Sequence, residues 1–138
     1  MPTPVKALKV VKIAKYSDEF VDAVNGGDDL VDLTSAQRRT HILDGDATGG
    51  GHRWPGLPGK TPFPKDWSDN EIMHNISDIA TDPAARWTGG GPKGSVLTRK
   101  GNPARFSVFG ERGGVCVKVV VEPAGEGIIT AHPAAGQC

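Results

Sequence analysis

The spacing of apolar residues changes in the course of this 138-residue chain, and that change restricts the folds open to it. In residues 68–82 the isoleucines recur at intervals of four and three, which places them on one face of a helix. In residues 115–121 a valine occupies every second position, as on one face of a strand. Because helical spacing comes first and strand spacing later, we expect an α+β domain.

Capping signals and runs of strand-forming residues define the expected elements. Thr34 and Gln37 have the spacing of a capping box, as do Ser68 and Glu71, so we predict one helix after Thr34 and another after Ser68. The first of these helices is expected to end near Leu43. Three short runs predict strands joined in an antiparallel meander, namely residues 106–109, 115–121 and 128–132.

The length of the chain allows one domain with one modest core. We expect the folded domain over residues 34–138, preceded by a leader over residues 1–33 with short helices in 4–15 and 17–24. The leader is consistent both with a helix docked on the domain and with a linker from a longer parent protein. No run approaches the ~20 apolar residues of a membrane span, so no membrane anchor is expected.

Positive charge is concentrated in one segment, although 16 basic and 16 acidic residues cancel over the whole chain. Residues 84–121 carry seven lysines and arginines against one glutamate, a net charge of +6. Such a segment is consistent with a surface that binds a polyanion and with a solvated loop. On charge alone, the solvated loop is the favoured interpretation.

A long loop over residues 45–66 carries several candidate functional groups. Six of its residues are glycine and four are proline, and loops of this length in small domains are often functional. Gly50 and Gly51 precede His52 and allow backbone amides to point at an anion, so His52 is a candidate general base. Lys60 supplies a positive charge for a phosphate or a developing oxyanion.

Other histidines and the cysteines have separate interpretations. His41 is expected in the last helical turn after Thr34, where the helix dipole favours the imidazolium and suits a general acid. His132 follows Thr130 by two residues, so both side chains project from one strand face. His74 is expected to be exposed, and Cys116 to be a small core residue. Two cysteines are too few for a disulfide framework or a four-cysteine zinc site.

Two imidazoles and one ammonium group indicate cleavage of RNA through its own 2′-hydroxyl. One base deprotonates the 2′-OH, one acid protonates the 5′-oxygen, and the cation offsets charge on the phosphorane, so no metal or other cofactor is expected. Two other interpretations remain open. One is a non-catalytic module that binds RNA or phosphate, and the other is a metal-dependent phosphodiesterase whose ion is held by His41, Asp44 and Asp46.

Five sequence blocks, taken in order, resemble the bacterial EndoU nuclease family, whose members are toxin domains at the ends of large secreted proteins. The blocks are His41-Ile42-Leu43-Asp44-Gly45-Asp46, Gly49-Gly50-Gly51-His52, Gly59-Lys60-Thr61, Phe63-Pro64 with Trp67-Ser68, and Ile129-Thr130-Ala131-His132-Pro133. The resemblance covers about residues 36–134. It implies an EndoU-like fold, in which a helical N-terminal part is followed by antiparallel sheets around a central cleft.

The resemblance also implies a role for each site residue. His41, His52 and Lys60 correspond to a catalytic triad that leaves a 2′,3′-cyclic phosphate and a 5′-hydroxyl. Thr130 corresponds to a threonine that contacts phosphate or base. His132 stands where the family commonly has a tyrosine that stacks on a base, so this chain departs from the family pattern there.

The biological setting implied by the resemblance is competition between bacteria. The domain is expected to be secreted as part of a larger toxin, to act as a monomer in the cytoplasm of the target cell, and to cleave RNA, with tRNA as the expected target. The producing cell is expected to hold a cognate immunity protein. Within the positive segment, Arg99 and Lys100 are the residues expected to bind the RNA.

Overall fold

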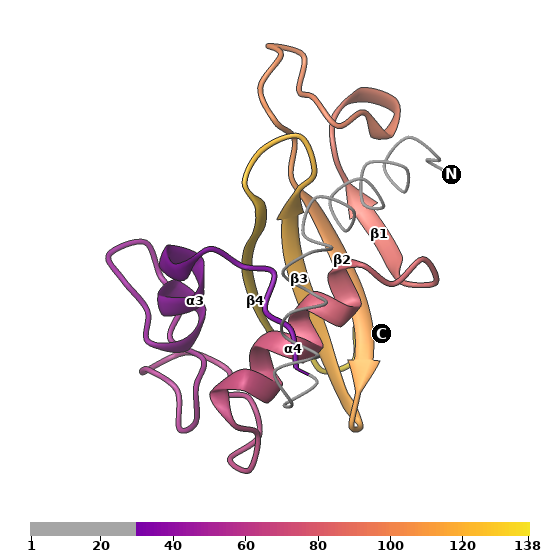
Figure 1. Ribbon diagram of the computed structural model, residues 1–138. Coiled ribbons are helices and arrows are strands. Elements are labelled where there is room, and N and C mark those ends of the chain that lie inside the picture. Colours follow the sequence, from indigo (N-terminus) through magenta and orange to yellow (C-terminus); the bar gives the residue numbers. More distant parts are fainter. Residues whose placement is uncertain (1–29) are drawn as a thin grey trace.

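The computed structural model describes residues 30–138, so the helices expected in residues 4–15 and 17–24 lie outside the described part. The described residues form two α-helices, one 3₁₀ helix and four strands (Figure 1). In chain order these are α3 (Ala36–Leu43), α4 (Asp69–Ala80), β1 (Arg86–Gly89), η1 (Pro92–Gly94), β2 (Phe106–Arg112), β3 (Val115–Glu122) and β4 (Gly127–Pro133). The α+β class is confirmed, and the expected central cleft stays a prediction.

The strands form one antiparallel sheet in the order β1-β2-β3-β4. The predicted three-stranded meander corresponds to β2, β3 and β4, and β1 is an additional edge strand. The sequence did not predict β1, because Trp87 is the only large apolar side chain in the segment Arg86–Gly89. Its side chains are mostly exposed, so the strand has no buried apolar alternation to identify it.

The core lies between α4 and one face of the sheet (Figure 1). The isoleucine stripe of α4 is fully buried, and three inward valines of β3 are buried as well, as their spacing predicts. Burial of each such side chain contributes roughly 1.5–3 kcal/mol. The residues involved are Ile72, Ile76 and Ile79 from α4, and Val117, Val119 and Val121 from β3.

One of the two predicted helix starts is confirmed and the other is wrong by one residue. Ser68 and Glu71 form the expected capping box at the start of α4. At α3, however, the N-cap is Ser35 and not Thr34, because the Ser35 side chain accepts the Arg38 N–H at 3.1 Å. The hydroxyl of Thr34 instead donates to the carboxylate of Asp32.

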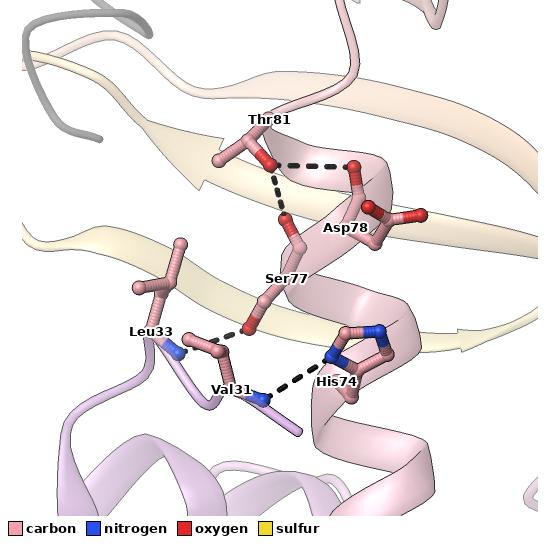
Figure 2. A pocket seen from close by; sticks show the side chains of 6 residues that line it. All are labelled: Val31, Leu33, His74, Ser77, Asp78 and Thr81. Atoms are coloured by element: carbon pink, nitrogen blue, oxygen red, sulfur yellow. Dashed lines mark hydrogen bonds between the residues drawn. The ribbon is translucent and has the colours of Figure 1, made fainter. Parts of the chain in front are cut away.

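Residues 30–33 lie along α4 and are held there by two side chains of that helix (Figure 2). The Val31 N–H donates to Nδ1 of His74 at 3.2 Å, and the Leu33 N–H donates to the Ser77 hydroxyl at 3.0 Å. His74 is therefore half-buried, and the prediction of an exposed histidine was wrong. Since Nδ1 accepts, the proton of a neutral His74 is on Nε2.

The chain's two cysteines, Cys116 and Cys138, form a disulfide that fixes the C-terminal tail to β3. The prediction of Cys116 as a core residue was wrong, because it lies on the sheet face opposite the buried valines. The Ala134 N–H also donates to the Cys116 carbonyl at 2.8 Å. No helix within residues 30–138 is both long and apolar enough to cross a membrane.

Candidate active site

The loop over residues 45–66 is attached to the last turn of α3 by backbone hydrogen bonds. The amides of Gly51, His52 and Arg53 donate to the carbonyls of residues 41–43 at 3.0, 2.8 and 3.2 Å, respectively. These carbonyls belong to the last turn of the helix, where the regular helical pattern leaves acceptors without partners, so the loop supplies donors to the end of the helix. The same bonds place His52 beside the end of the helix that carries His41.

His41 is buried, with 6% of its surface exposed, and its ring is fixed by Asp46. Nδ1 of His41 lies 3.0 Å from the Asp46 carboxylate. Hydrogen bonds from the hydroxyl and the backbone amide of Thr48, followed by the bond to His41, lower the pKa of Asp46 to about 2. Asp46 is thus a carboxylate at neutral pH, so Nδ1 of His41 donates to it and Nε2 is left for other partners.

His52 is also 6% exposed and is held by a different acceptor. Its Nδ1 lies 2.8 Å from the carbonyl oxygen of Thr61, and because a carbonyl only accepts, Nδ1 carries the proton. Burial lowers the pKa of His52 below 6.5, and the nearby positive charges of His132, Lys60 and His41 lower it further. His52 is therefore biased toward the neutral form, with an unprotonated Nε2.

Lys60 and His41 border one small space above Gly49. A methyl group at Gly49 would lie 3.7 Å from Nζ of Lys60 and 4.0 Å from Cε1 of His41. Glycine leaves this space open, with the ammonium group on one side and the imidazole on the other. The charges of Lys60 and His41 are also close enough to His52 to lower its pKa, so the structure brings the three side chains together.

His132 lies against His52, and the two rings are stacked with centroids 5.3 Å apart. Its Nδ1 donates to the Pro133 carbonyl at 2.8 Å, and the Thr61 hydroxyl donates to the same carbonyl at 3.2 Å. Pro133 thus ties the end of β4 to the residue that orients His52. Thr130 is two residues before His132, and both side chains lie on one face of β4.

The backbone amides of Gly50 and Gly51, both predicted to bind substrate, differ in their hydrogen bonds. The Gly51 N–H donates to the His41 carbonyl, so its prediction as an anion donor was wrong. Gly51 is needed for packing, since a Cβ there would lie 2.4 Å from Cδ1 of Leu57. Within residues 30–138 the Gly50 N–H has no hydrogen-bond acceptor, and its role in substrate binding stays a prediction.

The two residues predicted to bind RNA through their charge do not lie beside the histidines. Arg99 and Lys100 are exposed in a turn between η1 and β2. Figure 1 shows the chain between η1 and β2 extending beyond the end of the sheet, away from α3. The positive segment is not one patch either, because Arg105 pairs with Glu122 while Arg112 pairs with Asp78. Arg105 precedes β2 and Arg112 ends it, so their backbones lie about 23 Å apart, a separation that a charge count along the sequence does not reveal.

The predicted metal-ligand set is not assembled. Asp44 pairs with Arg53, whereas Asp46 pairs with His41, so their carboxylates serve different partners. Within the described part of the chain, no group of three or more His, Cys, Asp or Glu side chains is arranged to hold a metal ion.

The sequence did not identify the residues that hold the histidines in place, which are Asp46, Thr48 and Thr61. Asp46 was considered only as a metal ligand. Its position two residues before Thr48, in a turn that follows His41, is the local signal that would have indicated its role. Thr61 had no such signal, because it acts mainly through its backbone carbonyl.

Comparison with known protein families gives a match. The family model described as bacterial EndoU nuclease matches residues 55–135, which is more than half of the chain. The matched range contains Lys60, Thr130 and His132, while His41 and His52 precede it, so the match begins later than the expected residue 36. No curated protein and no solved structure matches the chain.

Proposed function

The chain belongs to the bacterial EndoU nuclease family, and from this premise we propose that it is an endoribonuclease that acts without a metal through the 2′-hydroxyl of its RNA substrate. The proposal rests on one observation, which is that His41 and His52 are held in the same way. Each ring donates Nδ1–H to a fixed acceptor, and each keeps Nε2 for the substrate, beside the ammonium group of Lys60.

His52 acts as the general base. Its neutral ring accepts the 2′-OH proton at Nε2, and the resulting 2′-oxygen attacks the neighbouring phosphorus. The low pKa that burial produces keeps this base unprotonated near neutral pH, although it also reduces the strength of the base.

His41 acts as the general acid. Its Nε2 donates a proton to the 5′-oxygen as the bond from phosphorus to that oxygen breaks, which leaves a 2′,3′-cyclic phosphate and a 5′-hydroxyl. The Asp46 carboxylate on Nδ1 holds the ring in place, and both this carboxylate and the C-terminal end of α3 put negative charge beside the ring that donates the proton. Lys60 offsets the negative charge that develops on the phosphorane oxygens.

Incubation of the purified protein with total tRNA, with and without EDTA, separates the three candidate functions. We expect cleavage that EDTA does not inhibit, with cyclic phosphate at the 3′ ends of the products. Cleavage that stops in EDTA would indicate the metal-dependent phosphodiesterase, and binding without cleavage would indicate the non-catalytic module.

Substitutions test the role of each group. His41→Ala, His52→Ala and Lys60→Ala should each abolish cleavage while the thermal unfolding temperature shows that the domain is still folded. Lys65→Ala is the matched control, because Lys65 is an exposed lysine of the same loop. Full activity in any of the three site variants would contradict the role assigned to that residue.

The family resemblance supports a biological setting for this activity. The domain is delivered as part of a larger secreted toxin, acts as a monomer on tRNA in the cytoplasm of the target cell, and is neutralised by an immunity protein in the producing cell. Expression of the domain alone in a bacterial cytoplasm should stop growth and degrade tRNA, and the His52→Ala variant should do neither. Normal growth with intact tRNA on expression of the wild-type domain would contradict this setting.

A further inference from the structure

The sheet face opposite α4 carries a row of basic side chains that leads to the candidate site. The strand register aligns Arg86 with Phe109, Phe109 with Lys118, and Lys118 with His132. Residues directly opposite each other in antiparallel strands have their side chains on the same face. The row therefore runs from β1 to β4, across about 14 Å of sheet, and ends at the ring that stacks on His52.

The side chains of this row have the contacts that the register implies. The Arg86 guanidinium lies 4.3 Å from the centroid of the Phe109 ring. Phe109 is buried but is not part of the core cluster beneath α4, which places it on the opposite face. Within residues 30–138 neither Arg86 nor Lys118 forms an ion pair with a carboxylate. The Arg86 guanidinium donates one hydrogen bond to the backbone carbonyl of Gln137, which leaves its positive charge without a neutralising partner.

The neighbouring row on the same face is rich in hydroxyl groups. The register places Thr88 opposite Ser107, and Val120 opposite both Ser107 and Thr130. Hydroxyls beside unpaired cations are groups that bind the phosphates and sugars of a nucleic acid. Thr130 belongs to this second row and lies beside His132, so the two rows meet at the candidate site.

Carboxylates on this face lie outside the two rows. Glu122 is neutralised by Arg105 at 2.8 Å. Glu111 is exposed and lies opposite Cys116, one row beyond Phe109 and Lys118. Glu111 is thus the negative charge that would oppose a phosphate bound along the basic row.

We propose that Arg86, Lys118 and His132 form a binding track for single-stranded RNA, which guides the strand across the sheet to His52. The track rests on the proposed nuclease function, and it deepens that function by giving the path of the substrate. Unlike the Arg99–Lys100 turn, which the sequence predicted to bind RNA, this track is continuous with the histidines.

Binding of a fluorescein-labelled single-stranded RNA oligonucleotide, measured by anisotropy over a range of salt concentrations, tests the track. All measurements use His41→Ala protein, so that binding is separated from cleavage. Loss of one phosphate contact should reduce the slope of log K against log salt by about 0.7 and weaken binding about fivefold at ~0.1 M salt. We expect this change for Lys118→Gln, and twice the change in slope for the Arg86→Gln/Lys118→Gln double variant.

Three further variants make the result specific. Lys118→Arg should restore the slope, Glu111→Gln should strengthen binding, and Lys100→Gln should change neither slope nor affinity. A wild-type slope in the folded double variant, or a reduced slope in Lys100→Gln instead of Lys118→Gln, would overturn the track. Wild-type protein that fails to cleave RNA, while binding still depends on Lys118, would refute the nuclease function and leave the track supported.

Discussion

Replacing Gly50 with alanine tests whether the close attachment of the 45–66 loop to α3 holds the two histidines together. Gly50 has φ +82° and packs directly on the backbone of α3. A Cβ at this position would lie 1.9 Å from the His41 carbonyl oxygen and 3.2 Å from Cδ2 of its ring. The loop must therefore move away from His41 to accept even a methyl group.

Gly59 in the same loop provides a matched control. Its φ is +79°, close to that of Gly50, but a Cβ there would have no atom within 4 Å. Gly59→Ala should therefore cost only the backbone strain of a left-handed residue, about 1–2 kcal/mol. Gly50→Ala adds the cost of inserting a methyl group into a packed site, about 1–3 kcal/mol more.

Urea unfolding followed by circular dichroism measures this difference. We expect Gly50→Ala to reduce the free energy of unfolding by about 1–3 kcal/mol more than Gly59→Ala, which corresponds to a melting temperature lower by roughly 4–12 °C. Gly50→Ala should also lose RNA cleavage, because His41 is displaced. Equal destabilisation by the two substitutions would refute the close packing of Gly50 on α3.

Three other predictions follow from single contacts. Because burial lowers the pKa of His52, the unfolded chain binds more protons than the folded one just below pH 6.5. The free energy of unfolding should therefore fall as the pH drops through this range. This dependence on pH should be weaker in His52→Gln, and an unchanged dependence would refute the lowered pKa of His52. Cys138→Ser opens a disulfide between residues 22 apart and should lower the free energy of unfolding by roughly 3 kcal/mol, a difference that a reducing agent should remove. His74→Leu removes the acceptor of the Val31 N–H, so amide hydrogen exchange should become faster at Val31 than in the wild type; equal rates would show that His74 does not hold this segment.

The fold was predictable where one side-chain pattern dominates. The stripe Ile72, Ile76 and Ile79 and the alternating valines of β3 indicated the helix and the strand correctly, because burial of one face alone determines them. β1 was not predictable in this way, since an exposed edge strand is held by backbone pairing to β2 and needs no apolar pattern. The Cys116–Cys138 disulfide depends on the path of the tail, which the sequence does not specify.

The candidate site was predictable to a similar extent. Adjacent glycines indicated His52 and Lys60, and the last turn of a predicted helix indicated His41; the structure brings these three side chains together. The groups that orient the rings were harder to identify, because the Thr61 carbonyl is a backbone atom and every residue has one. The charge of residues 84–121 was only a partial guide, since a count along the chain does not show which charges are paired, as Arg112 is with Asp78 on α4.

The most direct test of the proposed chemistry is a single change in the substrate. The cleavage site in tRNA is mapped first, and the ribose on its 5′ side is then replaced by 2′-deoxyribose in an otherwise identical RNA. If His52 removes the proton of a 2′-hydroxyl nucleophile, the wild-type protein should bind this RNA as before and should not cleave it at that position. Cleavage of the deoxy-substituted linkage at the normal rate would show that the nucleophile is a different group, and that the roles assigned to His41, His52 and Lys60 are wrong.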